Sequence, residues 1–147
     1  MGINLNPDEM FEVFGDFDPT EHQAEAEQRW GKTDAFKESQ KRTSKYKKED
    51  WKRLGKEQEE IGARMGEAMK KGTSATSAAA MDLAEQARLH IDRWFYPCSH
   101  EMHRNLGEMY VADPRFAKHY EDRAPGLAVW VRDAIVANAD RAKAKAK

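Results

Sequence analysis

The spacing of the apolar residues is the feature that most limits what this chain can fold into. Between residues 51 and 71 the apolar side chains lie three, four or seven positions apart, which places them on one face of a helix. Three later segments show the same period, and no segment alternates apolar and polar residues as a half-buried strand does. The sequence therefore predicts an all-α protein.

Capping residues and helix breakers predict where the helices begin and end. Thr33 and Ser99 are suitable N-cap residues, and Pro125 is expected to open the last helix. Gly72 and Pro97 end two others, because glycine favours the turn after a helix and proline disfavours helical geometry in the preceding residue. The expected helices cover residues 19–30, 33–44, 51–71, 78–96, 99–111 and 114–121, and a last one runs from residue 125.

Composition narrows the class of protein. The 147 residues make one domain, 39% hydrophobic and 35% charged, and no apolar run approaches the roughly 18 residues of a membrane span. The first residues lack the basic and apolar regions of a signal peptide, and the single cysteine cannot form an internal disulfide. We therefore expect a cytoplasmic protein without a membrane association. The formal charge of −1 argues against nucleic-acid binding by this chain alone.

Charge is segregated in the N-terminal third. Residues 1–28 carry eight acids and no base, whereas residues 29–56 carry eleven bases and four acids. The two segments either attract each other or meet a charged partner, or they are solvated helix faces. Because this region has little apolar surface, we expect residues 1–45 to form a loosely anchored helical lid. Residues 46–147 are expected to form the helical core with a ligand cleft.

A cysteine and two histidines lie close together in the sequence, at Cys98, His100 and His103. Such residues can bind a metal ion or form a thiolate–imidazole nucleophile, and His103 with His90 can ligate haem in a helical fold. No second cysteine and no third catalytic group is evident, and lone histidines usually belong to the edge of a core. We therefore expect no cofactor, no metal ion and no enzymatic activity.

Large apolar side chains are concentrated around the fifth expected helix. Its inward face is predicted to carry Met102, Leu106, Met109 and Tyr110, close in sequence to the aromatic residue Trp94. Methionine and aromatic side chains suit a pocket for a bulky apolar ligand, although core packing explains them as well. A second group, Phe11, Phe14 and Phe17, has three-residue spacing in a segment with little other apolar surface, which suggests a lid that closes over a ligand.

Several blocks, in matching order, resemble one known family. They are Phe11-Glu-Val-Phe-Gly-Asp-Phe-Asp-Pro19, Arg29-Trp-Gly-Lys-Thr-Asp34, Tyr46-Lys-Lys-Glu-Asp-Trp51, Glu101-Met-His103, Leu106-Gly-Glu-Met-Tyr-Val111, Pro125-Gly-Leu127 and Arg132-Asp-Ala-Ile-Val-Ala-Asn138. Together they resemble the TipA-type antibiotic-recognition domain (TipAS), the effector-binding half of MerR-family transcription activators. The resemblance covers almost the whole chain.

The resemblance implies both a fold and a function. It implies a globin-like helical bundle without haem that binds thiopeptide antibiotics such as thiostrepton, or another bulky macrocyclic antibiotic, in a cleft. N-terminal helices in that family fold over the bound drug. Members occur fused to a DNA-binding half, through which full-length homologues are expected to dimerise, or as free proteins that sequester drug. Because no winged helix precedes it, this chain resembles the free form.

One position departs from the family pattern. The resemblance implies a cysteine on the fifth helix that adds to a dehydroalanine of the antibiotic, and that cysteine aligns with Asn105 here. An amide cannot act as this nucleophile, so we expect reversible binding. Cys98 aligns with an earlier cysteine of the family, and it can substitute only if its thiol faces the cleft.

The sequence therefore supports a non-enzymatic antibiotic-binding domain most strongly. Two alternatives stay open: a helical protein-interaction module that uses the charged N-terminal segments, and a thiol enzyme that uses Cys98 with His100 or His103. The predicted ligand-binding residues are Phe11, Phe14, Phe17, Trp94, Cys98, Met102, Asn105, Leu106, Met109 and Tyr110.

Overall fold

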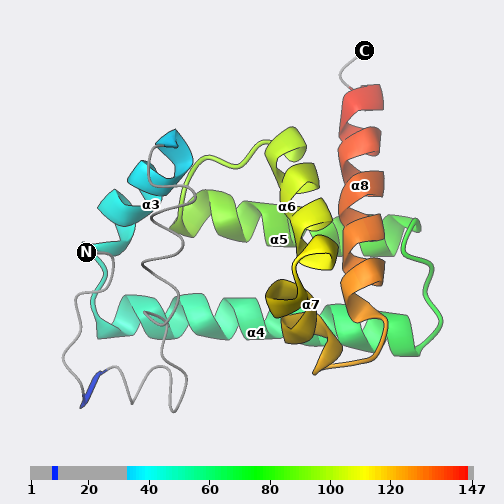
Figure 1. Ribbon diagram of the computed structural model, residues 1–147, viewed down its shortest axis with the longest axis horizontal. Coiled ribbons are helices and arrows are strands. Elements are labelled where there is room, and N and C mark those ends of the chain that lie inside the picture. Colours follow the sequence, from blue (N-terminus) through cyan, green and yellow to red (C-terminus); the bar gives the residue numbers. More distant parts are fainter. Residues whose placement is uncertain (1–7, 10–32, 146–147) are drawn as a thin grey trace. The chain divides into compact units, whose positions relative to one another are not determined.

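The computed structural model describes residues 8–9 and 33–145, and every regular element in these ranges is an α-helix (Figure 1). The prediction of an all-α protein is confirmed. None of the helices in the described ranges is both long and apolar enough to cross a membrane. The helices are α3 (Asp34–Thr43), α4 (Lys48–Lys70), α5 (Ala78–Trp94), α6 (His100–Ala112), α7 (Pro114–Glu121) and α8 (Leu127–Lys145). The expected helix at residues 19–30 lies outside the described residues.

The described residues group into two compact units. The first unit contains the chain up to Glu57 together with Ile91–Pro97, and the second contains Gln58–His90 and the chain from Cys98 onward. Helices α4 and α5 each contribute to both units. The lid at 1–45 and the core at 46–147, which we expect from the sequence, remain a prediction.

The predicted caps are present at three helix ends. Thr33 accepts a hydrogen bond from the backbone N–H of Phe36 at the start of α3, and Ser99 accepts one from Met102 at the start of α6. After α4, Gly72 has a φ of 84°, a left-handed conformation that suits glycine. These local interactions explain why the ends of α3, α4 and α6 fall close to their predicted positions.

The predicted start of the last helix is wrong by two residues. Helix α8 begins at Leu127 rather than at Pro125. Gly126 has a φ of 89°, which lies outside the helical region, and its carbonyl accepts the hydrogen bond from the Trp130 N–H. Pro125 is therefore not the first residue of the helix, because it precedes the turn that Gly126 makes.

The core of the second unit is built mainly by α8. Its expected apolar stripe is buried, and it packs with residues from α4 and α5. The buried cluster consists of Ile61, Met65, Ala80, Ala84, Ala124, Leu127, Trp130, Val131, Ala134 and Ile135. The Trp130 indole N–H donates a hydrogen bond of 3.0 Å to the Thr73 carbonyl, which satisfies its one polar atom inside this core.

Helices α6 and α8 lie side by side in the second unit (Figure 1), and a glycine sets how closely they approach. A Cβ added at Gly107 would lie 3.3–3.4 Å from side-chain atoms of Ile135. Gly107 and His103 are the buried residues of α6. The predicted inward face of this helix is therefore wrong for Met102, Leu106 and Met109, which do not pack against the buried cluster, whereas its fourth residue, Tyr110, does. The side of α6 that packs on α8 carries Gly107.

The first unit has a different kind of anchor, which satisfies backbone groups at the end of α5. The last carbonyls of a helix have no partner within it, and here the Arg42 guanidinium donates to the Asp92 carbonyl at 2.7 Å. The Tyr46 hydroxyl donates to the carbonyl of Trp94, and the side chains of Arg93 and Glu57 form an ion pair of 2.7 Å. Helix α3 is therefore held by polar contacts at its C-terminal end.

Alanine substitutions at two glycines test this account of helix packing. The Ile135 side chain is 1% exposed and would have to shift within a packed core, so Gly107→Ala is expected to lower the free energy of unfolding by about 1 kcal/mol. Nothing lies within 4 Å of a Cβ at Gly55, so Gly55→Ala is expected to raise it by about 0.5–1 kcal/mol, the difference in helix propensity. Urea denaturation measures both, and a stabilised Gly107→Ala variant would contradict the close packing.

Candidate functional site

One face of α6 carries four of the predicted ligand-binding residues and is not used by the core. Met102, Asn105, Leu106 and Met109 follow one another at three, four and three residues, so they share a side of the helix. Asn105 is exposed and the three apolar side chains are partly exposed. None of the three belongs to the buried cluster of the second unit or to the side chains packed against it. This group is called the α6 face below.

Two other predicted residues lie elsewhere in the second unit. Tyr110 packs against the core, and its ring centroid lies 5.4 Å from that of Tyr120 and 6.1 Å from that of Phe116. The side chain of Cys98 is buried, with 2% of the residue exposed. Cys98 is therefore closed to a ligand in this conformation, whereas Tyr110 is partly exposed.

The remaining predicted aromatic residue, Trp94, belongs to the first unit. Its ring lies edge-on to Tyr46, at 5.5 Å between centroids, and the Arg53 guanidinium carbon lies 5.8 Å from its centroid. The buried Nε1 of Trp94 has no hydrogen-bond acceptor among the described residues. Phe11, Phe14 and Phe17 lie outside the described residues.

A groove in the second unit does not contain any of the predicted residues. Its volume is about 360 Å³. It is lined by Thr76, Glu108, Arg132, Asp133, Val136, Ala137 and Asp140. Its carboxylates are already engaged, because Asp133 pairs with Arg132 at 2.6 Å and Asp140 pairs with Arg104. The groove is distinct from the α6 face. It does not test where the predicted ligand cleft lies, because it contains none of the predicted ligand-binding residues.

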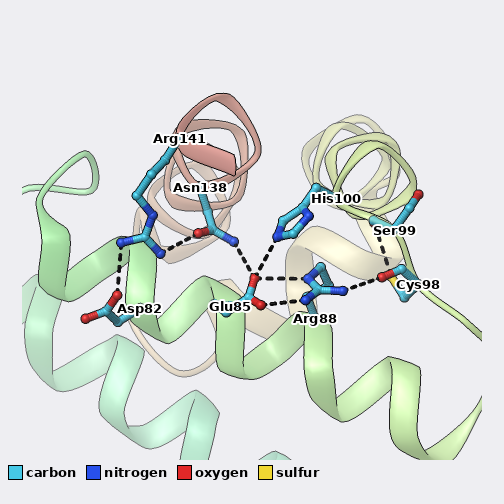
Figure 2. A network of polar contacts seen from close by, with 8 residues as sticks. All are labelled: Asp82, Glu85, Arg88, Cys98, Ser99, His100, Asn138 and Arg141. Atoms are coloured by element: carbon cyan, nitrogen blue, oxygen red, sulfur yellow. Dashed lines mark hydrogen bonds and ion pairs between the residues drawn. The ribbon is translucent and has the colours of Figure 1, made fainter. Parts of the chain in front are cut away.

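Beside the start of α6, the carboxylate of Glu85 is the centre of a polar network that sequence analysis did not predict (Figure 2). Its Oε1 accepts from the Arg88 Nε and from the Asn138 Nδ2, each at 3.0 Å, and lies 3.0 Å from the His100 Nε2. The side chains come from α5, α6 and α8. One carboxylate thus joins three helices of the second unit.

The network continues to both sides of Glu85. Arg88 also donates through Nη1 to the carbonyl of Cys98, at 2.7 Å. On the other side Asn138 accepts from Arg141 at 2.6 Å, and Arg141 pairs with Asp82 at 3.0 Å. The Arg88 hydrogen bond lowers the pKa of Glu85 to about 2, against an opposing effect of burial, with smaller contributions from Asn138 and His100.

The structure does not arrange Cys98, His100 and His103 as a metal site or as a nucleophile. Within the described residues no group of three or more potential ligands (His, Cys, Asp, Glu) is placed to hold a metal ion. The Cys98 Sγ lies 3.7 Å from the Ser99 carbonyl oxygen, and His100 contacts Glu85. A buried thiol in this setting has no surface at which a substrate can reach it.

His103 is buried beneath the same network. It is 1% exposed, and its Nε2 has no hydrogen-bond partner among the described residues. Burial lowers its pKa to about 4, and the positive charge of Arg88 acts in the same direction. His103 is therefore neutral at physiological pH and serves as a packing residue between α6 and the core.

Two sequence signals point to the network in retrospect. Asn138 continues the buried stripe of α8, so it is an amide where the pattern calls for an apolar residue. Glu85 and Arg88 are three residues apart on one helix and can therefore pair. Neither signal indicates that Cys98 and His100 join the same group, because those contacts link different parts of the chain.

Comparison with known sequences gives one family and several relatives. A family model described as the TipAS antibiotic-recognition domain matches residues 22–138. The HTH-type transcriptional activator TipA of Streptomyces coelicolor (strain ATCC BAA-471 / A3(2) / M145) is 51% identical over 141 residues, which are 96% of this chain and 56% of the activator. The activator mta of Bacillus subtilis (strain 168) is 33% identical over 143 residues, 95% of this chain and 54% of the activator. The chain thus spans a little over half the length of these relatives.

Two solved structures are similar. One is of a thiopeptide antibiotic multidrug resistance system from Streptomyces lividans, nosiheptide in complex with TipAS. It has a TM-score of 0.87 and 50% identity, and the match covers 96% of this chain and 99% of that one. The other is the antibiotic binding domain of a TipA-class multidrug resistance transcriptional regulator. It has a TM-score of 0.58 and 47% identity, covering 63% of this chain and 98% of that one.

We expect acid to destabilise the second unit in two overlapping pH ranges. Between pH 6.5 and about 4 the unfolded chain binds a proton at His103 that the folded protein does not, so the free energy of unfolding falls as the pH falls. The folded-state pKa of Glu85 is lowered to about 2 from 4.5, so its contribution is complete above pH 4.5 and is lost as the pH falls toward 2.

The His103→Gln variant separates the two ranges. Between pH 6.5 and about 4 its stability is expected to fall by about 3 kcal/mol less than that of the unaltered protein, which corresponds to the lowered pKa of His103. Urea denaturation at several pH values measures this difference. Equal losses for the two proteins would show that His103 is not held neutral by burial.

Proposed function

The chain belongs to the TipAS antibiotic-recognition domain family, and on that basis we propose that it binds thiopeptide antibiotics through the α6 face. The single observation that carries this proposal is the likeness, over 96% of the chain, to a solved TipAS structure named for its nosiheptide complex. The apolar residues of the α6 face support the same conclusion, since they are partly exposed and lie outside the buried cluster of the second unit.

The chemistry of the α6 face suits a large apolar ligand. Burial of apolar surface contributes about 25 cal/mol per Å², so three large side chains can supply several kcal/mol of affinity. Met102 and Met109 have flexible thioether chains that adapt to irregular rings. The Asn105 amide stands among them and can exchange hydrogen bonds with the peptide-like groups of a macrocycle.

The other predicted contacts are part of the proposal. We infer that the Trp94 ring also contacts the ligand, and that Phe11, Phe14 and Phe17 belong to a lid within residues 1–45. Tyr110 packs against the core but is partly exposed, so it can contact the ligand at the edge of the α6 face. Cys98 would require movement of the chain, because it is buried. Ordering a lid uses about 2–5 kcal/mol of the contact energy.

Two cellular roles are compatible with antibiotic binding. We propose that the domain either senses drug as the effector part of a transcription activator or sequesters drug as a free protein in the cytoplasm. Its formal charge of −1 argues against direct binding of nucleic acid by this chain. In an activator we propose that DNA binding and dimerisation belong to a separate half. The relatives named HTH-type transcriptional activators are nearly twice as long as this chain.

Asn105 determines the kind of complex that we propose. A cysteine at this position would add its thiol across the double bond of a dehydroalanine, forming a C–S bond at the β-carbon while the proton passes to the α-carbon. An amide has no such reactivity, and the thiol of Cys98 is buried. The complex is therefore reversible.

Titration with thiostrepton and nosiheptide tests the proposed function. Amide NMR is expected to show shifts along α6 and sharp new resonances from residues 1–45, and intact-mass spectrometry after denaturation is expected to show the unmodified protein. An unchanged spectrum with both drugs would contradict thiopeptide binding. A stable adduct would contradict reversibility.

The Asn105→Cys variant is the matched positive case. Because residue 105 is exposed on the α6 face, the new thiol is expected to give an adduct equal to the mass of the drug. The same adduct is expected with Asn105→Cys/Cys98→Ala, which removes the buried thiol. If only the variant that keeps Cys98 reacts, the reactive residue is Cys98 and the proposed orientation of α6 is wrong.

A pair of apolar truncations tests where the drug binds. Leu106→Ala removes partly exposed apolar surface from the α6 face and is expected to raise the Kd for thiopeptide about 10-fold, because roughly 1–2 kcal/mol of contact is lost. Val129→Ala removes a side chain that is 47% exposed on α8, and it should leave the Kd unchanged. Isothermal titration calorimetry measures both. Equal effects would place the binding surface elsewhere.

A further inference from the structure

Arg88 connects α5 to the start of α6 with several donors of one guanidinium group. Its Nε lies 3.0 Å from a carboxylate oxygen of Glu85, and its Nη1 lies 2.7 Å from the carbonyl oxygen of Cys98 (Figure 2). The Arg88 side chain is 14% exposed, far less than in the surface ion pairs of this chain such as Lys71–Glu67. Because the guanidinium donors have a fixed planar geometry, Arg88 fixes the positions of the Glu85 carboxylate and the Cys98 carbonyl relative to each other.

The residues that Arg88 and Glu85 contact lie on both sides of Ser99, the N-cap of α6. Cys98 precedes Ser99, whose hydroxyl accepts from the Met102 N–H at 3.0 Å, and His100 follows it. Arg88 holds the Cys98 carbonyl, and Glu85 meets His100 at 3.0 Å. Asn138 of α8 donates to the same carboxylate. The first turn of α6 is thus bound to α5, and through Glu85 to α8.

The middle of α6 is fixed independently, where Gly107 lies against Ile135. Two fixed points along a helix determine the direction of its axis. Met102, Asn105 and Leu106 lie between the cap and Gly107, so their positions depend on both points. Loss of the point at the cap would allow this part of α6 to shift while the packing on α8 is kept.

We propose that Glu85 and Arg88 are positioning residues for ligand recognition: they hold the cap of α6 so that the α6 face is fixed before the ligand arrives. The inference rests on the proposed function, because it assigns to this pair the geometry of the proposed binding face. Neither residue contacts the ligand in this account. Their contribution is a binding surface that needs no reordering.

Arg88→Lys tests the proposal with a conservative change. A lysine keeps the positive charge and can pair with Glu85, but its single nitrogen cannot bridge Glu85 and the Cys98 carbonyl in the geometry of the fork. We expect faster hydrogen exchange at the amides of Met102 and His103, which bond to Ser99. We also expect a thiopeptide Kd about 10-fold higher, with an almost unchanged urea midpoint.

Arg123→Lys is the matched control. Arg123 pairs with Glu59 at 2.8 Å and its side chain is 29% exposed, but it lies against Gly62 and Gly66 of α4 rather than at the α6 cap. This variant is expected to change neither the cap exchange rates nor the Kd. Glu85→Gln is expected to raise the cap exchange rates and the Kd as Arg88→Lys does, but also to lower the urea midpoint, because the carboxylate that pairs with Arg88 is lost. The Kd of the double variant should be little higher than that of either single one, because the two residues act as a unit.

The two readouts distinguish the possible failures. Unchanged cap exchange rates and an unchanged Kd in Arg88→Lys would overturn the positioning role, and so would a Kd that rises only in proportion to lost stability. Faster cap exchange with an unchanged Kd would show that the cap does not control recognition, which also overturns it. Failure of the unaltered chain to bind either drug would contradict the proposed function itself, whereas the exchange rates would still report whether Arg88 fixes the cap.

Discussion

The close approach of α6 to α8 is the constraint on which the second unit depends. It exists because Gly107 has no side chain at the point where α6 meets the buried Ile135. A methyl group there would lie 3.3–3.4 Å from Ile135 atoms, closer than side chains in a core ordinarily pack. Once the two helices are this close, His103 is enclosed and loses water, while Met102, Leu106 and Met109 stay outside the buried cluster.

This division of α6 into two faces connects the fold to the proposed function. Residues that usually build a core, two methionines and a leucine, remain partly exposed because a glycine and a histidine occupy the packed side. Neighbouring apolar side chains that a helix leaves partly exposed are a feature that binding surfaces share. The proposed drug-binding role thus follows from how the helix is rotated, and not only from the presence of apolar residues.

The polar network around Glu85 gives direction to an otherwise apolar assembly. Apolar contacts are non-directional and leave the orientation of a helix weakly determined. A carboxylate that meets partners from three helices requires each of them at hydrogen-bond distance, since unpaired polar groups with little solvent access are costly. In the first unit, Arg42 and Tyr46 act in a comparable way on the last carbonyls of α5.

The sequence by itself determined the helical class, most helix ends and the family, because periodicity and caps such as Thr33 and Ser99 act within a few neighbouring residues. It also identified the buried stripe of α8. Only the tertiary structure decided which face of α6 is buried, because apolar content favoured Met102 and Leu106 whereas the fit against Ile135 selected Gly107. It alone brought Glu85, Cys98, His100 and Asn138 together, because those contacts depend on how distant helices pack.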